Sequence, residues 1–101
     1  MNRKITLRQG ETVLSTITGL FEIFDGIQHV YFGDLVLTNK RLYVASHKLQ
    51  NIEESLWFEN GIRDAGQSSI IVGEQGITVR WTYKGSLLNF MNAFRRLSGS
   101  A

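Results

Sequence analysis

The stretch GDLVLTNKRLYV, residues 33–44, predicts a β-hairpin with one continuous apolar face. If Asn39 and Lys40 form a two-residue loop, Leu37 faces Leu42 on the neighbouring strand. Alternation then directs the leucines toward a core and leaves Thr38 on the outer side, facing water. Asn39 suits the loop because it tolerates the positive φ of a primed turn. The expected pairs are Thr38–Arg41, Leu37–Leu42, Val36–Tyr43 and Leu35–Val44.

Short alternating segments on both sides of this hairpin predict further strands. The turn signal Asp25-Gly26 separates the first two strands, and Gly33 inside the second predicts a bulge or bend. Residues 60–68 read as an irregular loop, of the kind that often carries function. In the last strand, Trp81 and Tyr83 are expected to share a face with Ile77 and Val79. The expected strands are 13–24, about 30–38, 41–46, 52–59, 69–72 and 76–83.

One helix is predicted near the end of the chain, over residues 86–97. Ser86 is a suitable N-cap, and apolar residues recur after it at helical spacing. This apolar stripe has to be buried, and the mouth of the preceding sheet is the surface available. Residues 98–101 are expected to form a tail. The stripe consists of Leu87, Phe90, Met91, Phe94 and Leu97.

Two motifs carry a family resemblance. Residues 10–14, GETVL, are followed about twenty residues later by G-x-L-x-L-T-N-x-R-L-Y. This arrangement resembles the GRAM and bacterial pleckstrin-homology-like domains over roughly residues 10–97. The resemblance implies one domain over residues 1–101, with a lead-in over about 1–9. It implies a mainly β fold, a barrel of two bent antiparallel sheets capped by the C-terminal helix. Eukaryotic members of these families often bind phosphoinositides, whereas the bacterial members have no general ligand.

Composition narrows the functional classes. The 101 residues suffice for one domain, and 43% hydrophobic with 20% charged residues is typical of a globular protein. The absence of cysteine excludes disulfides, thiolate metal sites and a cysteine nucleophile. No apolar run is long enough to span a bilayer, so we expect a cytoplasmic protein, with peripheral membrane association as the alternative.

Enzyme chemistry has little support in the residues. His29 and His47 have no acidic residue at metal-ligand spacing, and we expect both near the surface at strand ends. Neither G-x-S-x-G nor a glycine-rich phosphate loop occurs, so no catalytic residue, cofactor or metal is predicted. Aromatic residues could stack on nucleic acid, but we assign most of them to the core. These aromatics are Tyr31, Phe32, Tyr43, Trp57, Trp81 and Tyr83.

A non-enzymatic interaction module is therefore the expected function. Val36, Tyr43 and Trp57 lie on the predicted outer face and form the candidate protein interface, for a second copy or for another protein. The alternative is an anionic lipid headgroup bound through Lys40 and Arg41 at a membrane surface. Residues 25–29, between the first two strands, are acidic to neutral, which disfavours the phosphoinositide alternative.

Overall fold

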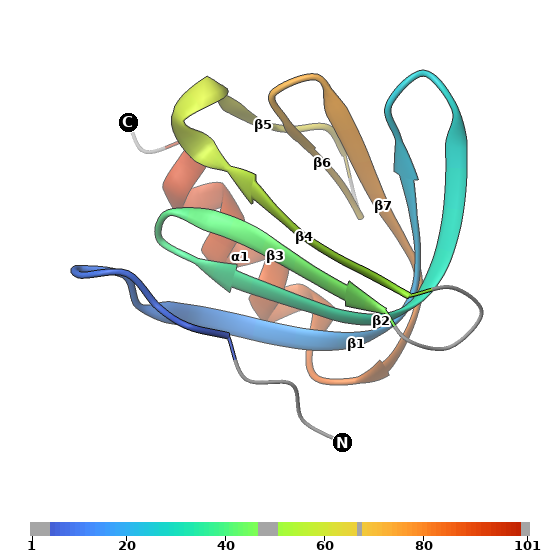
Figure 1. Ribbon diagram of the computed structural model, residues 1–101, viewed down its shortest axis with the longest axis horizontal. Coiled ribbons are helices and arrows are strands. Elements are labelled where there is room, and N and C mark those ends of the chain that lie inside the picture. Colours follow the sequence, from blue (N-terminus) through green and yellow to red (C-terminus); the bar gives the residue numbers. More distant parts are fainter. Residues whose placement is uncertain (1–4, 47–50, 67, 100–101) are drawn as a thin grey trace.

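The computed structural model describes residues 5–46, 51–66 and 68–99. In these residues one antiparallel sheet curls into a half-barrel, and a C-terminal helix packs against it (Figure 1). Part of the predicted lead-in, His47 and the end of the predicted tail lie outside the described residues. The elements are β1 (Val13–Phe24), β2 (Gln28–Thr38), β3 (Arg41–Ser46), β4 (Ile52–Trp57), the 3-10 turn η1 (Phe58–Asn60), β5 (Ile62–Asp64), β6 (Ser69–Val72), β7 (Gln75–Lys84) and α1 (Leu87–Ser98).

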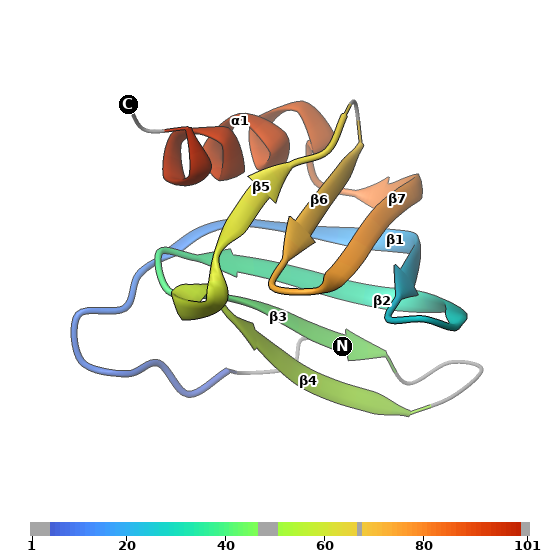
Figure 2. The same cartoon turned by 90° about the horizontal axis from the view of Figure 1, so that it is seen from above.

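The strand order is β4-β3-β2-β1-β7-β6-β5, so β4 and β5 are the two edges of the described sheet. The long strands β1 and β2 bend strongly, and Figure 2 shows that the β5–β7 part lies across the β1–β4 part with a gap between their edges. The mainly β architecture with one terminal helix confirms the coarse prediction. The prediction of two separate sheets is wrong for the described residues: β1 pairs with both β2 and β7, so the strands form one continuous curled sheet that is open between β4 and β5.

The hairpin register predicted from residues 33–44 is confirmed. Leu37 pairs with Leu42, and the next two pairs of the ladder are those expected. Gly33 pairs directly with Gly19 on β1 without a shift of register, so of the two predicted alternatives, a bulge or a bend, the bulge is wrong. A Cβ at Gly33 would lie 2.2 Å from the carbonyl oxygen of Ala45, a separation that only glycine permits.

The core lies between the concave face of the sheet and α1. Ser86 caps the helix as predicted, since its hydroxyl accepts a hydrogen bond from the Asn89 amide at 3.1 Å. Phe90, Met91 and Phe94 are buried, while Leu87 and Leu97 pack at the margin of the core. The predicted apolar stripe of the helix is therefore confirmed.

Two strand predictions are wrong in detail. Residues 60–68 are not wholly irregular, because they contain β5, whose Arg63 pairs with Ile71 of β6. The fourth strand ends at Trp57 and is followed by η1. Sequence alternation did not reveal β5 because it is only three residues long and follows Gly61, which has a φ of 100°.

The last strand changes face halfway along its length. Val79 pairs with Phe21, but Trp81 pairs with the very next residue, Leu20, so Arg80 is an extra residue on β7. This bulge reverses the alternation, because two residues of one strand oppose one position of its partner. A second shift follows, since Thr82 pairs with Gly19 and Lys84 with Thr18, which leaves Tyr83 as another extra residue. Ile77 and Val79 are buried, whereas Trp81 is 56% and Tyr83 64% exposed. The prediction that all four side chains share a face is wrong.

Candidate functional site

The residues of the two family-like motifs meet in one buried polar cluster. The Glu11 carboxylate accepts a hydrogen bond from Arg41 Nε at 2.8 Å and another from the Thr38 hydroxyl at 2.7 Å. The backbone amide of Arg8 donates to the same carboxylate at 2.9 Å. Arg41 also donates to the carbonyl oxygen of Thr6 at 2.7 Å and to the Ser55 hydroxyl at 2.8 Å. We call Glu11, Thr38 and Arg41 the Glu11 cluster.

The charged side chains of the Glu11 cluster are buried, and their contacts with one another determine the pKa of Glu11. The side chain of Glu11 has no exposed surface, and that of Arg41 is 9% exposed. Burial alone would raise the pKa of the Glu11 carboxyl, but the hydrogen bonds from Arg41, the Arg8 amide and Thr38 outweigh it and lower the pKa to about 2. Glu11 is thus ionised at neutral pH and Arg41 is its counter-ion.

Asn39 joins the same region through its side chain. Its Oδ1 accepts a hydrogen bond from the Thr12 amide at 2.7 Å, and its Nδ2 donates to the carbonyl oxygen of Gly10 at 3.0 Å. The prediction of positive φ at Asn39 is wrong, because only glycines have positive φ in the described residues. Asn39 therefore fits its place by binding the N-terminal segment, a role that the hairpin sequence alone does not reveal.

The N-terminal segment, residues 5–12, covers part of the hairpin face that was predicted to be exposed. Ile5 packs against Val36, Tyr43 and Ala45, which form a second small core on the convex side of the sheet. Figure 2 shows this segment curving round the end of the sheet where β3 begins and β4 ends, on the side away from α1. Val36 is 8% and Tyr43 5% exposed, so the expectation that they form an exposed patch is wrong. The Tyr43 hydroxyl donates to the Glu53 carboxylate.

Trp57 is partly buried, and of the predicted anion-binding residues Lys40 is exposed and Arg41 is buried. The Trp57 ring is partly buried, and the guanidinium groups of Arg8 and Arg41 lie 4.4 and 4.5 Å from its centroid. Thr38 and Arg41 were expected to face water, but both are buried in the Glu11 cluster. Lys40 is exposed. Of the two residues predicted to bind an anion, only Lys40 has its charge at the surface.

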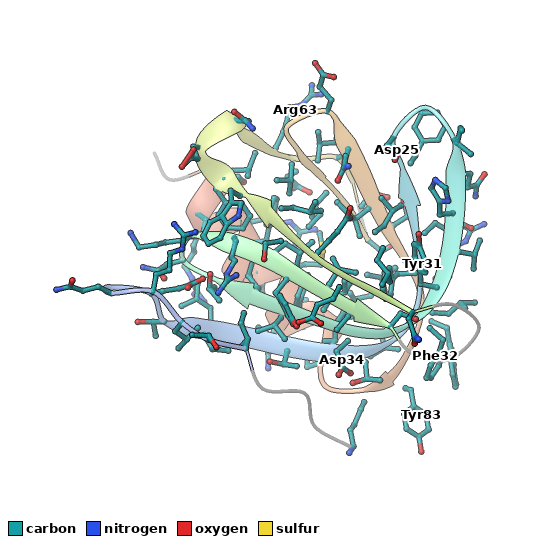
Figure 3. All side chains as sticks on the ribbon, viewed as in Figure 1. Asp25, Tyr31, Phe32, Asp34, Arg63 and Tyr83 are labelled. Atoms are coloured by element: carbon teal, nitrogen blue, oxygen red, sulfur yellow. The ribbon has the colours of Figure 1, made fainter. Side chains whose placement is uncertain are left out.

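The exposed face of the sheet carries a cluster of three aromatic rings. The centroids of Phe32 and Trp81 are 6.2 Å apart, those of Phe32 and Tyr83 6.2 Å, and those of Trp81 and Tyr83 6.0 Å. Such separations are typical of aromatic pairs in contact. Figure 3 shows Tyr83 projecting away from the sheet beside Phe32. We call Phe32, Trp81 and Tyr83 the aromatic surface.

The register explains how distant residues form the aromatic surface. Phe32 of β2 and Trp81 of β7 both pair with Leu20 of β1, so the side chains of Phe32, Trp81 and Leu20 share the convex face. Val30 lies two residues before Phe32 on the same face and is 45% exposed, which extends the apolar area. The sequence contains these aromatics, but the extra residue at Arg80 that turns Trp81 outward gives no periodic signal.

Charges of both signs border the aromatic surface. Asp34 and Lys84 each pair with Thr18 of β1, in a row next to the aromatic rings. The Thr18 hydroxyl donates to Asp34 at 2.6 Å, which confirms that the two side chains share a face. On the other side, Arg80 contacts Glu22 at 3.0 Å. The surroundings are therefore mixed in charge rather than basic, which does not favour a nucleic-acid backbone.

A few other titratable side chains meet near the turn between β1 and β2, but they do not form a metal site. Residues 5–46, 51–66 and 68–99 contain no group of three or more histidine or acidic side chains that could hold a metal ion. His29 lies 3.5 Å from Asp25 and stacks on Tyr31 with ring centroids 6.2 Å apart. Burial, together with the charges of Glu54 and Asp25, raises the pKa of Tyr31. These contacts assemble no nucleophile with a base.

The comparisons with known proteins return no relative. No family model matches the chain, and no curated protein or solved structure matches it. No helix in the described residues is long and apolar enough to cross a membrane.

Proposed function

We propose that the protein is a non-enzymatic, pleckstrin-homology-like interaction module that self-associates through the aromatic surface. Support for the fold family comes from the motif resemblance together with the sheet order, in which β1 joins β2–β4 on one side and β5–β7 on the other, and from the helix that covers one end. The Glu11 cluster gives the motif residues a structural role, so binding is assigned to other residues.

The observation that carries this proposal is the exposure of Trp81 and Tyr83 in contact with Phe32. Tryptophan and tyrosine are the side chains that interfaces enrich, and they supply large contact area with few rotatable bonds. Here, the bulge at Arg80 turns Trp81 out of the core, where the strand alternation would have placed it. A strand that exposes tryptophan in this way has a surface suited to a partner.

A second copy of the chain is the partner that the charges favour. Asp34 and Lys84 lie in one row beside the rings, so the surface can meet its own copy without like charges opposing each other. Pairing through the edge strand β4 is disfavoured instead, because Glu53 and Glu54 are exposed there and would repel the same residues of a copy. Self-association by face contact is therefore preferred.

Sedimentation equilibrium of the native chain at about 100 μM tests the proposal, because an ordinary specific interface dissociates in the micromolar range. We expect a mass twice that of one chain, and the mass of one chain after Trp81→Lys. The matched control is Leu88→Lys, which replaces an apolar side chain of α1 that is 67% exposed, and which should leave the dimer intact. A monomeric native protein, or equal dissociation by both substitutions, would refute self-association through this face.

Anion binding through Lys40 and Arg41 has weaker support. A guanidinium already bound to a buried carboxylate has little to gain from a phosphate, and freeing it would leave Glu11 charged and unpaired in the interior. Lys40 alone is a single exposed charge. Protein contact therefore remains the preferred proposal over a lipid headgroup.

A further inference from the structure

The two parts of the curled sheet leave a groove between their edges. It has a volume of about 630 Å³ and is lined on one side by Ser55, Leu56 and Trp57 of β4. On the other side it is lined by the turn between β6 and β7, including Gly73, Glu74 and Gln75. This groove, which we call the β4 groove, is separate from the aromatic surface on the convex face.

One wall of the β4 groove is a strand edge without a neighbour. In the described residues β4 pairs with β3 on one side, and it is the last strand of the sheet. An open edge presents backbone amides and carbonyls that an extended peptide can pair with as an added strand. Leu56 and Val72 line the groove with apolar side chains, which suits the alternating side chains of such a peptide.

A buried acceptor in the groove lacks a donor. The side-chain oxygen Oε1 of Gln75 has essentially no exposed surface and makes no hydrogen bond in the described residues. A buried polar atom without a partner is costly, and most are satisfied in folded proteins. Because Gln75 lines the groove, a change of its rotamer would bring this oxygen to the groove, where a ligand that donates an N–H group would satisfy it.

The charge around the groove indicates the sign of the ligand. Glu74 lines it, and Glu54 of β4 pairs with the core residue Val44, which puts Glu54 on the concave side. Both glutamates are exposed. Arg8 and Arg41 both lie over the Trp57 ring, but the side chain of Trp57 is on the convex face, opposite to that of Leu56, and the charge of Arg41 is neutralised by Glu11. The groove is therefore acidic, and it disfavours a second β4 strand that brings the same glutamates.

We propose that the β4 groove binds an extended basic peptide segment of another protein, as an added strand on the open edge of β4. Backbone pairing with β4 supplies the affinity, and lysine or arginine side chains face Glu54 and Glu74. A donor from the peptide completes the hydrogen bonding of Gln75. This inference does not depend on the self-association proposed above, because the two surfaces use different residues.

Fluorescence anisotropy with labelled seven-residue peptides tests the proposal on the full chain. A peptide that alternates lysine and valine should bind with a Kd of about 10 to 100 μM, and a glutamate–valine peptide at least about 20-fold more weakly. Amide resonances of Ser55, Leu56 and Trp57 should shift on binding. No binding at 1 mM, or equal binding of both peptides, would overturn the inference.

Three substitutions distinguish peptide binding in the β4 groove from attraction of the peptide to the net charge of the protein. Gln75→Leu removes the unpartnered oxygen and should weaken binding by about 5- to 10-fold while the protein remains folded. Glu74→Lys should weaken binding by at least about 5-fold. Asp64→Lys makes the same charge change beside α1, where Asp64 pairs with Arg95 at 3.0 Å, and should change affinity less than about 2-fold at physiological salt. Equal effects of Glu74→Lys and Asp64→Lys would assign the binding to net charge and refute the groove.

Discussion

Replacing Glu11 by glutamine is the most informative single change to the fold. Glutamine keeps the shape of the side chain but removes the charge that Arg41 and Thr38 bind. The pKa of Glu11 falls from 4.5 to about 2 on folding, which corresponds to about 3 kcal/mol of stability at neutral pH. We expect Glu11→Gln to lower the free energy of unfolding by about that amount, because it leaves Arg41 buried without a counter-ion.

The pH dependence of this loss follows from the direction of the pKa shift. A lowered pKa stabilises the folded state above the unfolded value of 4.5, and the contribution disappears as pH falls toward 2. Urea unfolding should therefore show a difference between native protein and Glu11→Gln that is full at pH 7 and declines between about pH 5 and pH 2.

Glu59 supplies the control for this experiment. It is exposed on η1, and Glu59→Gln removes the same charge with an expected cost under about 0.5 kcal/mol. The reasoning would be refuted if Glu11→Gln were as mild as Glu59→Gln at pH 7. It would also be refuted if the loss did not vary with pH.

Two further predictions concern backbone contacts. Gly33→Ala should cost more than about 3 kcal/mol in urea unfolding, since its Cβ would lie 2.2 Å from the Ala45 carbonyl oxygen, whereas Gly76→Ala meets nothing within 4 Å and should cost under about 1; equal costs would contradict this geometry. Ser86→Ala should cost about 0.5 to 2 kcal/mol, because it removes the acceptor of the Asn89 amide; a loss under about 0.2 kcal/mol would show that the cap contributes little.

The local sequence pattern was sufficient to predict much of the fold. Leu37 and Leu42 pair as predicted because alternation and a two-residue loop leave a single register that keeps the leucines on one face. The helix after Ser86 was predictable for a similar reason, since a polar cap precedes an apolar stripe of helical spacing. Both features depend on residues close together in sequence.

Long-range contacts explain the predictions that are wrong. Thr38, Arg41 and Tyr43 are outward in the hairpin, as alternation indicates, but residues 5–12 cover that side of the sheet. Nothing in the hairpin sequence reports that cover. The available signal in the sequence was a pair of opposite charges: Glu11 in the first motif lies 30 positions before Arg41 in the second motif and could have been proposed as its partner.

The candidate site was missed for a different reason. Trp81 and Tyr83 follow Ile77 and Val79 at an even spacing, and that spacing indicates a single face. The extra residue at Arg80 reverses the face, and it is visible only when β7 is aligned with β1. A bulge depends on pairing with another strand, so the sequence of one strand does not show it.

The chain has two tryptophans, and a dilution series on their indole N–H resonances tests the proposed self-association most directly. Trp81 is 56% exposed in the aromatic surface, whereas Trp57 lies against Arg8 and Arg41. We predict that the Trp81 resonance shifts as the protein is diluted from about 500 to 10 μM, across the micromolar range of an ordinary interface, while the Trp57 resonance stays fixed. A Trp81 resonance that does not change with concentration, or a shift confined to Trp57, would contradict the account.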